Sequence, residues 1–287
     1  MGALLIGLTD FIRNYEDGSS LRAPVFRLTE GMRWFLLVPF FFLSACGLAE
    51  DDVISEEKAT EVMNAFQGQR YGKVIELTEG LSEDSKWRRI RGIAFQRRGM
   101  DRFFEKGEVD GAIADFDAFL ELYPEEDAHH WQRGLAYYYA EEYEKGKAQF
   151  ERHQTVNTQD VENAAWHFLC SVRAPGGTIE KAREEFIDIQ RDSRVPMKEV
   201  HALFAGKGTA EEVLAASKPD DDNVLSDAER NNLCYAHLYL GLYYEAVGDL
   251  EKSEEHIRKA AFEYSMEHPM GKVAQLHAKV RGISPVN

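Results

Sequence analysis

One pattern of side chains occurs twice between Ile93 and Asp160, at a constant offset of 34 residues. The matched pairs are Met100 with Gly134, Phe103 with Tyr137, Val109 with Tyr143, Ala112 with Gly146, Phe116 with Phe150, and Pro124 with Thr158. A fixed period of this length is typical of chains that stack one supersecondary unit repeatedly, because each unit buries its apolar face only against its neighbours. This repeat restricts the fold more than any other feature of the sequence.

The residue types at these positions are similar to those of the tetratricopeptide repeat. Small residues such as Ala112 and Gly134 stand where two helices of one hairpin cross, and aromatic residues fill the space beside the crossing. Repeats fit near 93–126, 127–160, 163–196 and 234–267. The resemblance implies an all-α fold, a tetratricopeptide-type solenoid of helical hairpins with a right-handed superhelical twist, over 56–287.

Several positions depart from the repeat pattern. Met100 occupies a small-residue position with Gly99 just before it, so we expect the opening helix of the first repeat to be shifted by one residue. Arg173 stands where the third repeat should have an aromatic residue, and its charge must reach solvent or a carboxylate. Thr178 is the expected N-cap of a helix that continues through Phe186.

The segments outside the regular repeats also predict helices. Degenerate hairpins are expected at 56–81 and 197–218, the first of them capping one end of the array. The sequence from Ser85 to Lys106 is helical in pattern, and Pro219 to Asn223 is the most loop-like interior segment. A last amphipathic helix over 271–280 is expected to cap the carboxyl end.

The pattern of the amino-terminal segment predicts an export signal. Arg33 precedes an apolar run from Trp34 to Leu43, which is too short for an ordinary spanning helix but suits the core of a signal peptide. The run ends in Leu-Ser-Ala-Cys, which resembles a bacterial lipobox with Cys46 as the lipidated residue. The sequence thus predicts a signal peptide over 1–46 and an acidic tether over 47–55, and residues 1–31 form an upstream extension if Met32 is the start.

The location of the mature chain follows from the lipobox interpretation. In the sorting rule of enteric lipoproteins, Asp after the lipidated Cys retains the protein at the inner membrane, and here the residue is Gly47. That resemblance implies the bacterial cell envelope, at the outer membrane facing the periplasm. An uncleaved anchor, an ordinary secretory signal with an incidental Cys46, and a cytosolic scaffold translated from Met1 remain the alternatives.

Charge narrows the choice of partner. The formal net charge is −16, and an acidic surface repels phosphate backbones, so nucleic acid is not an expected partner. One segment is locally basic, because it contains six arginines, at positions 88, 89, 91, 97, 98 and 102. They form either a solvated face balanced by nearby carboxylates or a docking stripe for an acidic partner or lipid head groups.

No catalytic signature is present, so we expect the protein not to be an enzyme and to have no cofactor. The sequence contains no GxSxG, HExxH, GxxxxGK[ST] or GxGxxG. Its three cysteines include no CxxC pair, and Cys170 and Cys234 lie among apolar neighbours in predicted helices. Histidines 129, 130, 153 and 167 lie in one stretch, but the repeat places His153 and His167 on different helices, which disfavours a metal site.

Repeat geometry gives a better site prediction. In tetratricopeptide folds, certain positions of each first helix line a concave groove that binds extended peptides. Counted in this sequence, they are Arg97, Asp101, Phe104, Trp131, Leu135, Tyr138, Tyr139, His167 and Ser171. Rings bury large areas at low entropic cost, while Arg and His fix the register of a peptide. The alternative is that Trp131, Tyr138 and Tyr139 pack on neighbouring helices.

The whole layout resembles the new-lipoprotein-I family of envelope lipoproteins. The resemblance covers about 57–280 and is carried by QRGLAYYYAEEYEKGKAQF at 132–150 and LYLGLYYEAVGDLEKSEEHIRKAA at 238–261. It implies a lipid-anchored adaptor that binds protein or peptide partners of the bacterial envelope. An enzyme, or a protein that binds a metal or small ligand in the aromatic groove, is the alternative from another class.

Overall fold

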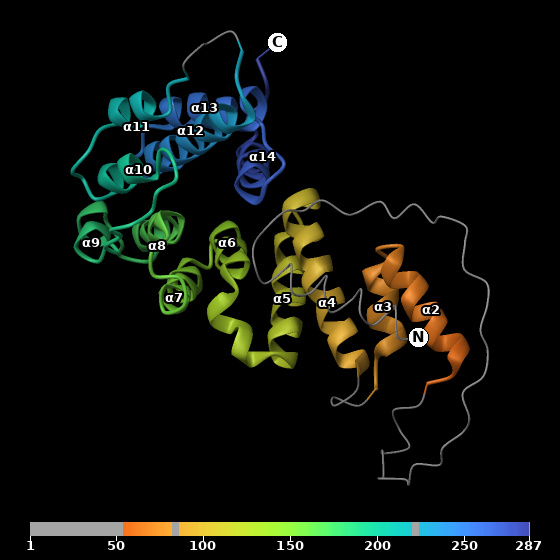
Figure 1. Cartoon of the computed structure of the whole chain (residues 1–287). Helices are drawn as coiled ribbons and strands as arrows, with labels where there is room; N and C mark the ends of the chain where they lie inside the picture. Colours follow the sequence, from red (N-terminus) through yellow and green to blue (C-terminus); the bar gives the residue numbers. More distant parts are fainter. Residues whose placement is uncertain (1–53, 82–85, 220–223, 287) are drawn as a thin grey trace. The chain divides into compact units, whose positions relative to one another are not determined.

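The computed structural model describes residues 54–81, 86–219 and 224–286, which belong to one unit extending over 48–287. Within these ranges every regular element is a helix and no strand occurs, so the predicted all-α class is confirmed (Figure 1). The predicted signal peptide, Cys46, the tether up to residue 53 and most of the predicted loop 219–223 lie outside the described residues.

Most helices that follow one another in sequence pack side by side, α9 and α10 being an exception among the described residues. Their bounds are α2 (Glu56–Gln67), α3 (Tyr71–Thr78), α4 (Lys86–Met100), α5 (Val109–Leu122), α6 (Trp131–Tyr139), α7 (Tyr143–Gln154), α8 (Val161–Arg173), α9 (Ile179–Glu184), α10 (Met197–Phe204), α11 (Ala210–Ala216), α12 (Asp227–Val247), α13 (Leu250–Arg258) and α14 (Pro269–Arg281). The helices predicted at 56–66, 197–204 and 271–280 are therefore confirmed, while α3 ends three residues before the predicted Leu81.

The same glycine–ring contact joins the two helices in each of the first two repeats. A Cβ atom on Gly134 would lie 2.7 Å from Cζ of Phe150, and one on Gly99 would lie 2.5 Å from Cε1 of Phe116. Gly99 thus takes the position expected for residue 100, which confirms the predicted shift. A π-helical turn over Asp101–Lys106 follows α4 directly, and such turns accommodate one extra residue in a helix.

The third and fourth repeats follow this scheme unequally. A Cβ atom on Gly241 would lie 2.6 Å from Cδ1 of Ile257, so the fourth repeat has the same crossing. In the third repeat Thr178 caps α9 as predicted, accepting a hydrogen bond from the backbone N–H of Lys181 at 3.2 Å. The prediction that this helix continues through Phe186 is wrong, because α9 ends at Glu184 and 186–196 contain no helix.

The described apolar side chains form two buried clusters. The smaller one joins α2, α3 and α4 and contains Val62, Ala65, Val74, Trp87, Ile90 and Ala94. The larger one extends from Phe103 to Ala278 and includes most of the aromatic repeat positions. The first hairpin therefore contacts the rest of the chain mainly through α4, as expected of a unit at the end of an array.

Candidate functional site

The structure divides the nine predicted groove residues into two groups. Leu135, Tyr138, His167 and Ser171 are buried, whereas Arg97, Asp101, Phe104, Trp131 and Tyr139 are half-buried. Tyr138, His167 and Ser171 are at most 8% exposed, while Leu135 lines a pocket described below. Peptide binding by the nine residues stays a prediction, and the Tyr139 part of this surface lies against the carboxyl-terminal helix.

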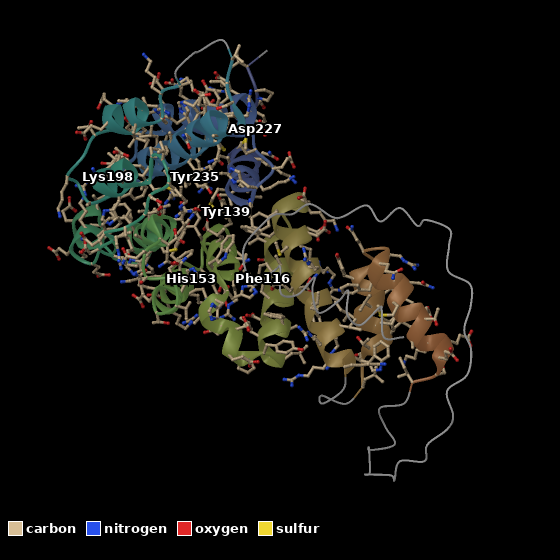
Figure 2. All side chains as sticks on the ribbon, viewed as in Figure 1. Phe116, Tyr139, His153, Lys198, Asp227 and Tyr235 are labelled. Carbon is tan, nitrogen blue, oxygen red and sulfur yellow. The ribbon has the colours of Figure 1, made fainter. Side chains whose placement is uncertain are left out.

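Helix α14 covers the tyrosine side of the predicted groove. The hydroxyl of Tyr139 lies 3.1 Å from Nδ1 of His277, and Nζ of Lys279 donates to the backbone carbonyl of Lys106 at 2.8 Å. Figure 2 shows Tyr139 in this position beside α14. The apolar face of α14 needs an apolar surface to cover it, and the tyrosines supply one within the chain.

A buried carboxylate fixes this arrangement. Glu245 of α12 lies 3.0 Å from Nη2 of Arg173, forms an ion pair with Arg281 of α14, and accepts a hydrogen bond from the Tyr138 hydroxyl at 3.2 Å. Burial raises the pKa of the Glu245 carboxyl, but the positive groups His277, Arg173 and Arg281 outweigh burial and lower it. The expectation that Arg173 reaches a carboxylate is thereby confirmed.

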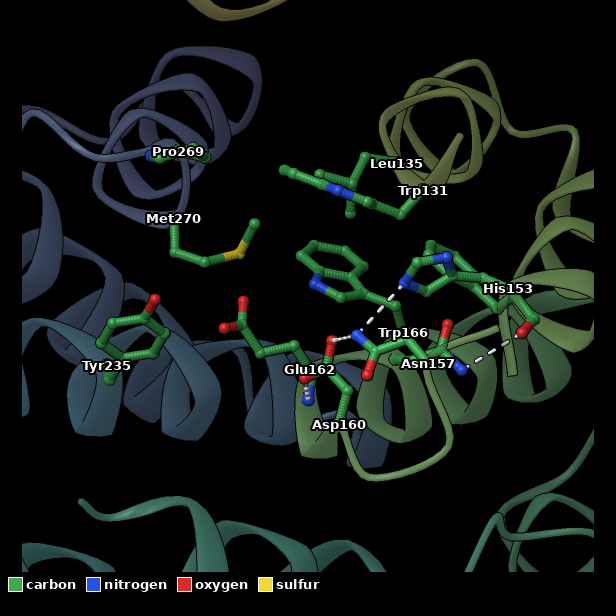
Figure 3. A pocket seen from close by; sticks show the side chains of 12 residues that line it. Trp131, Leu135, His153, Asn157, Asp160, Glu162, Trp166, Tyr235, Pro269 and Met270 are labelled. Carbon is green, nitrogen blue, oxygen red and sulfur yellow. Dashed lines mark hydrogen bonds between the residues drawn. The ribbon is translucent and has the colours of Figure 1, made fainter. Parts of the chain in front are cut away.

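A pocket remains open beside the covered tyrosines. It has a volume of about 250 Å³ and is formed by side chains from α6, α7, α8, α12 and α14 and the loop before α8 (Figure 3). Its lining residues are Trp131, Leu135, Phe150, His153, Asn157, Asp160, Glu162, Asn163, Trp166, Tyr235, Pro269 and Met270. Of the predicted groove residues, Trp131 and Leu135 take part in it.

Aromatic rings form one side of the pocket. Trp131 descends from α6 above Trp166 of α8, and Tyr235 faces them from α12 (Figure 3). Trp166 is 1% exposed and packs edge-on against Tyr138, with ring centroids 5.2 Å apart. Its indole Nε1 is buried without a hydrogen-bond partner and faces the same space as the Glu162 carboxylate.

Carboxylates gather at the other side, where α8 begins. Asp160 is the N-cap of α8 and accepts from the backbone N–H of Glu162 at 3.1 Å, while Asp192 accepts from that of Val161 at 3.1 Å. Arg194 forms ion pairs with all three carboxylates, at 2.6 Å to both Asp160 and Asp192. The positive end of the helix dipole also favours these charges.

This environment raises the pKa of the Glu162 carboxyl. It accepts a hydrogen bond from the Tyr239 hydroxyl at 3.2 Å besides its ion pair with Arg194. Burial and the charge of Asp160 raise its pKa to about 7, against the lowering effects of Arg194 and Tyr239. A carboxyl with such a pKa in a pocket is a functional-site candidate, because ordinary stabilising ion pairs lower the pKa instead.

No protein-family model matches the sequence, and no curated protein matches it significantly. The function must therefore be argued from the residues themselves. Within the described ranges, no helix is both long and apolar enough to span a membrane.

The predicted basic stripe is largely engaged inside the chain. Arg98 and Arg102 bind the buried Asp115, with Nη2 of Arg98 at 2.6 Å from Oδ1 and Nη1 of Arg102 at 2.8 Å from Oδ2. Arg91 donates to the backbone carbonyl of Thr78 at 3.0 Å. These contacts favour the interpretation as a balanced face over a docking stripe.

The histidine stretch does not converge. Nε2 of His130 lies 2.6 Å from Oε1 of Gln96, and Nδ1 of His153 lies 2.9 Å from the carbonyl of Ala128. Among the residues that the structure describes, no group of three or more His, Cys, Asp or Glu side chains is arranged to hold a metal ion.

Sequence reasoning missed the acidic side of the pocket. Asp160 before an apolar helix indicates an N-cap, and an acidic residue in the first turn, as at Glu162, is a common feature of helices. Tyr235 is separated from Glu162 by 73 positions, and nothing in the 34-residue period pairs them. Only the return of α12 and α14 toward α8 brings these groups together.

Proposed function

We propose that this protein is a tetratricopeptide-type scaffold that binds a protein partner at the pocket between Trp131 and Glu162. A helix crossing at glycine recurs in three repeats and supports the repeat type, since Gly99 and Gly134 each face a phenylalanine ring and Gly241 faces Ile257. The pocket carries the functional part of the proposal. It is the place where half-buried rings and a perturbed carboxyl meet.

The pocket offers a partner better anchoring than the tyrosine surface that α14 covers. Trp131 keeps part of its indole ring accessible, and Trp residues at the centre of small pockets dominate many binding energies. With about 250 Å³, the pocket accepts one side chain rather than a folded surface. The partner would therefore insert a single residue there and contact the rim with its backbone.

The sequence adds a location to this proposal. Lipidation at Cys46 would hold the chain at the bacterial cell envelope, as in the new-lipoprotein-I family that the layout resembles, and several acyl chains on one residue make such anchoring stable. Palmitate labelling tests this part: we expect label in the wild type, loss of it in Cys46→Ala, and globomycin-sensitive processing. Label that persists in Cys46→Ala would exclude the lipobox.

Crosslinked co-purification from membranes tests the scaffold itself. We expect Trp131→Ala to lose a partner that the wild type retains. Phe262→Ala is the matched control, because Phe262 is 42% exposed and lies outside the pocket. Recovery of no partner with the wild type would end the proposal, and equal recovery with Trp131→Ala would move the binding site elsewhere.

A second candidate is the binding of a small molecule, and the aromatic and acidic lining of the same pocket supports it. A protonatable Glu162 beside aromatic rings is a common arrangement for a polar ligand or for acid–base chemistry. Native mass spectrometry of protein purified from cells distinguishes the two, because a small ligand adds a fixed mass and a protein partner dissociates as a second chain.

A further inference from the structure

The acidic side of the pocket has more negative than positive charge. Asp160 and Glu162 line the pocket, and together with Asp192, which does not, they form ion pairs with the one guanidinium of Arg194 among the residues that the structure describes. Their side chains are 19%, 13% and 4% exposed, so water screens them poorly. The helix N-terminus offsets about half a charge, and Glu162, with a pKa of about 7, is about half ionised at neutral pH, so about one negative charge remains uncompensated.

The aromatic rings beside these carboxylates also favour a positively charged ligand. Trp131 lies above the space in front of Glu162, and Trp166 faces that space with the Nε1 edge of its indole ring (Figure 3). Tyr235 lies on the opposite side, where its ring stacks on His268 with centroids 5.1 Å apart. Aromatic faces attract cations, Trp most strongly, and the attraction increases when the cation is desolvated. Carboxylate and rings therefore favour a positive ligand independently of one another.

Two buried polar atoms of the lining residues have no hydrogen-bond partner among the residues that the structure describes. They are Nε1 of Trp166, a donor, and Oδ1 of Asn163, an acceptor. Met270 of α14 reaches into the space between Trp166 and Tyr235 (Figure 3), and a Met side chain changes rotamer readily. A ligand that displaces it could supply both an acceptor for the indole and a donor for the amide oxygen.

We propose that the pocket binds the side chain of a lysine presented by the partner protein, with its ammonium group at Glu162 and its methylene chain between the tryptophan rings. This inference rests on the proposed scaffold function and specifies what the partner inserts. Lysine fits better than arginine, because Arg194 and Tyr239 already occupy part of the Glu162 carboxylate. A compact ammonium needs fewer coplanar acceptors than a guanidinium. The backbone carbonyl of the inserted residue would be available to Trp166.

Titration with small probes tests the chemistry directly. The probe is N-acetyl-lysine methylamide, and the uncharged control is N-acetyl-norleucine methylamide. The readout is the ¹⁵N–¹H NMR signals of the indole groups of Trp87, Trp131 and Trp166. We expect the lysine probe to shift the signals of Trp131 and Trp166 saturably, to leave Trp87 unchanged, and to bind at least about tenfold more tightly than the norleucine probe.

Two matched variants test whether the Glu162 carboxylate binds the ammonium group of the probe. Glu162→Gln keeps the size of the side chain and should weaken the lysine probe at least about tenfold, whereas Glu254→Gln, on the exposed side of α13, should bind like the wild type. Equal binding of both probes, unchanged affinity in Glu162→Gln, or no saturable shift would each overturn the inference. Binding of n-butylamine as tight as that of the lysine probe would make the ligand a free amine, and would overturn it as well.

The partner experiment separates this inference from the function on which it rests. If Glu162→Gln retains the crosslinked partner as well as the wild type does, the lysine inference fails and the scaffold proposal stands. If the wild type retains no partner while the lysine probe still binds through Glu162, the scaffold proposal fails and the pocket chemistry stands.

Discussion

Replacing Glu162 by Gln should make the folded protein more stable at pH 8. The carboxyl has a pKa of about 7 in the fold against an ordinary value of 4.5. Because the folded pKa is raised, ionisation costs stability: the penalty is absent below pH 4.5, grows as the pH rises, and is complete above pH 7. A difference of about 2.5 in pKa corresponds to about 3 kcal/mol. Glutamine keeps the hydrogen-bonding oxygen but removes this charge.

Urea unfolding followed by circular dichroism measures the effect. We expect Glu162→Gln to gain about 2 to 3 kcal/mol at pH 8 and nothing at pH 4. Glu245→Gln is the matched comparison, since Glu245 is also buried but its pKa is lowered by its positive neighbours. It should lose about 2 to 4 kcal/mol at pH 8. A loss of stability in Glu162→Gln at pH 8, or an equal gain at both pH values, would refute the reasoning.

Three further predictions follow from buried contacts. Gly134→Ala should cost about 1 to 3 kcal/mol in urea unfolding, because its Cβ would meet the Phe150 ring at 2.7 Å, while Gly111→Ala, which meets only a flexible arginine side chain, should be neutral or stabilising. Acid should destabilise the wild type below pH 6.5, because burial lowers the pKa of His237 to about 3. The free energy of unfolding should fall by about 1.4 kcal/mol per pH unit for each such histidine. A His237→Gln variant whose free energy of unfolding depends on pH as steeply as that of the wild type would contradict this. Deleting α14 and the residues after it should raise 8-anilinonaphthalene-1-sulfonate fluorescence by uncovering the Tyr139 surface, and unchanged fluorescence with native helicity would contradict that packing.

The local pattern of the sequence predicted the helices well where one interaction repeats. The contacts of Gly134 with Phe150 and of Gly241 with Ile257 follow from the repeat pattern, because each is made within one hairpin between residues 16 positions apart. The sequence also predicts that Gly99 replaces residue 100 at the helix crossing of the first repeat, but it does not predict the π-helical turn over Asp101–Lys106 that follows. Helix α9 was predicted too long, since local propensity does not show that 186–196 leave the helix.

The candidate site shows the opposite case. The repeat position of Trp131 predicts its part in a site. The same pattern assigns Tyr138 and Tyr139 to an open groove, but Tyr138 contacts Glu245 of α12 and Tyr139 contacts His277 of α14, each more than 100 positions away in sequence. The sequence does not single out Glu162, because a glutamate in the first turn of a helix is ordinary. Its pKa is perturbed only in the fold, where it is buried beside Asp160 and Arg194.

The sequence by itself determined that this chain folds as packed helical hairpins, since the spacing of small and aromatic residues encodes contacts that are local to each hairpin. Only the tertiary structure decided which surface remains open. Helices α12 and α14 return to pack against α6 and α8 through a shared buried carboxylate, Glu245, and no periodic pattern encodes a contact between elements so far apart in the chain. That return covers the tyrosines and leaves the pocket between Trp131 and Glu162 open.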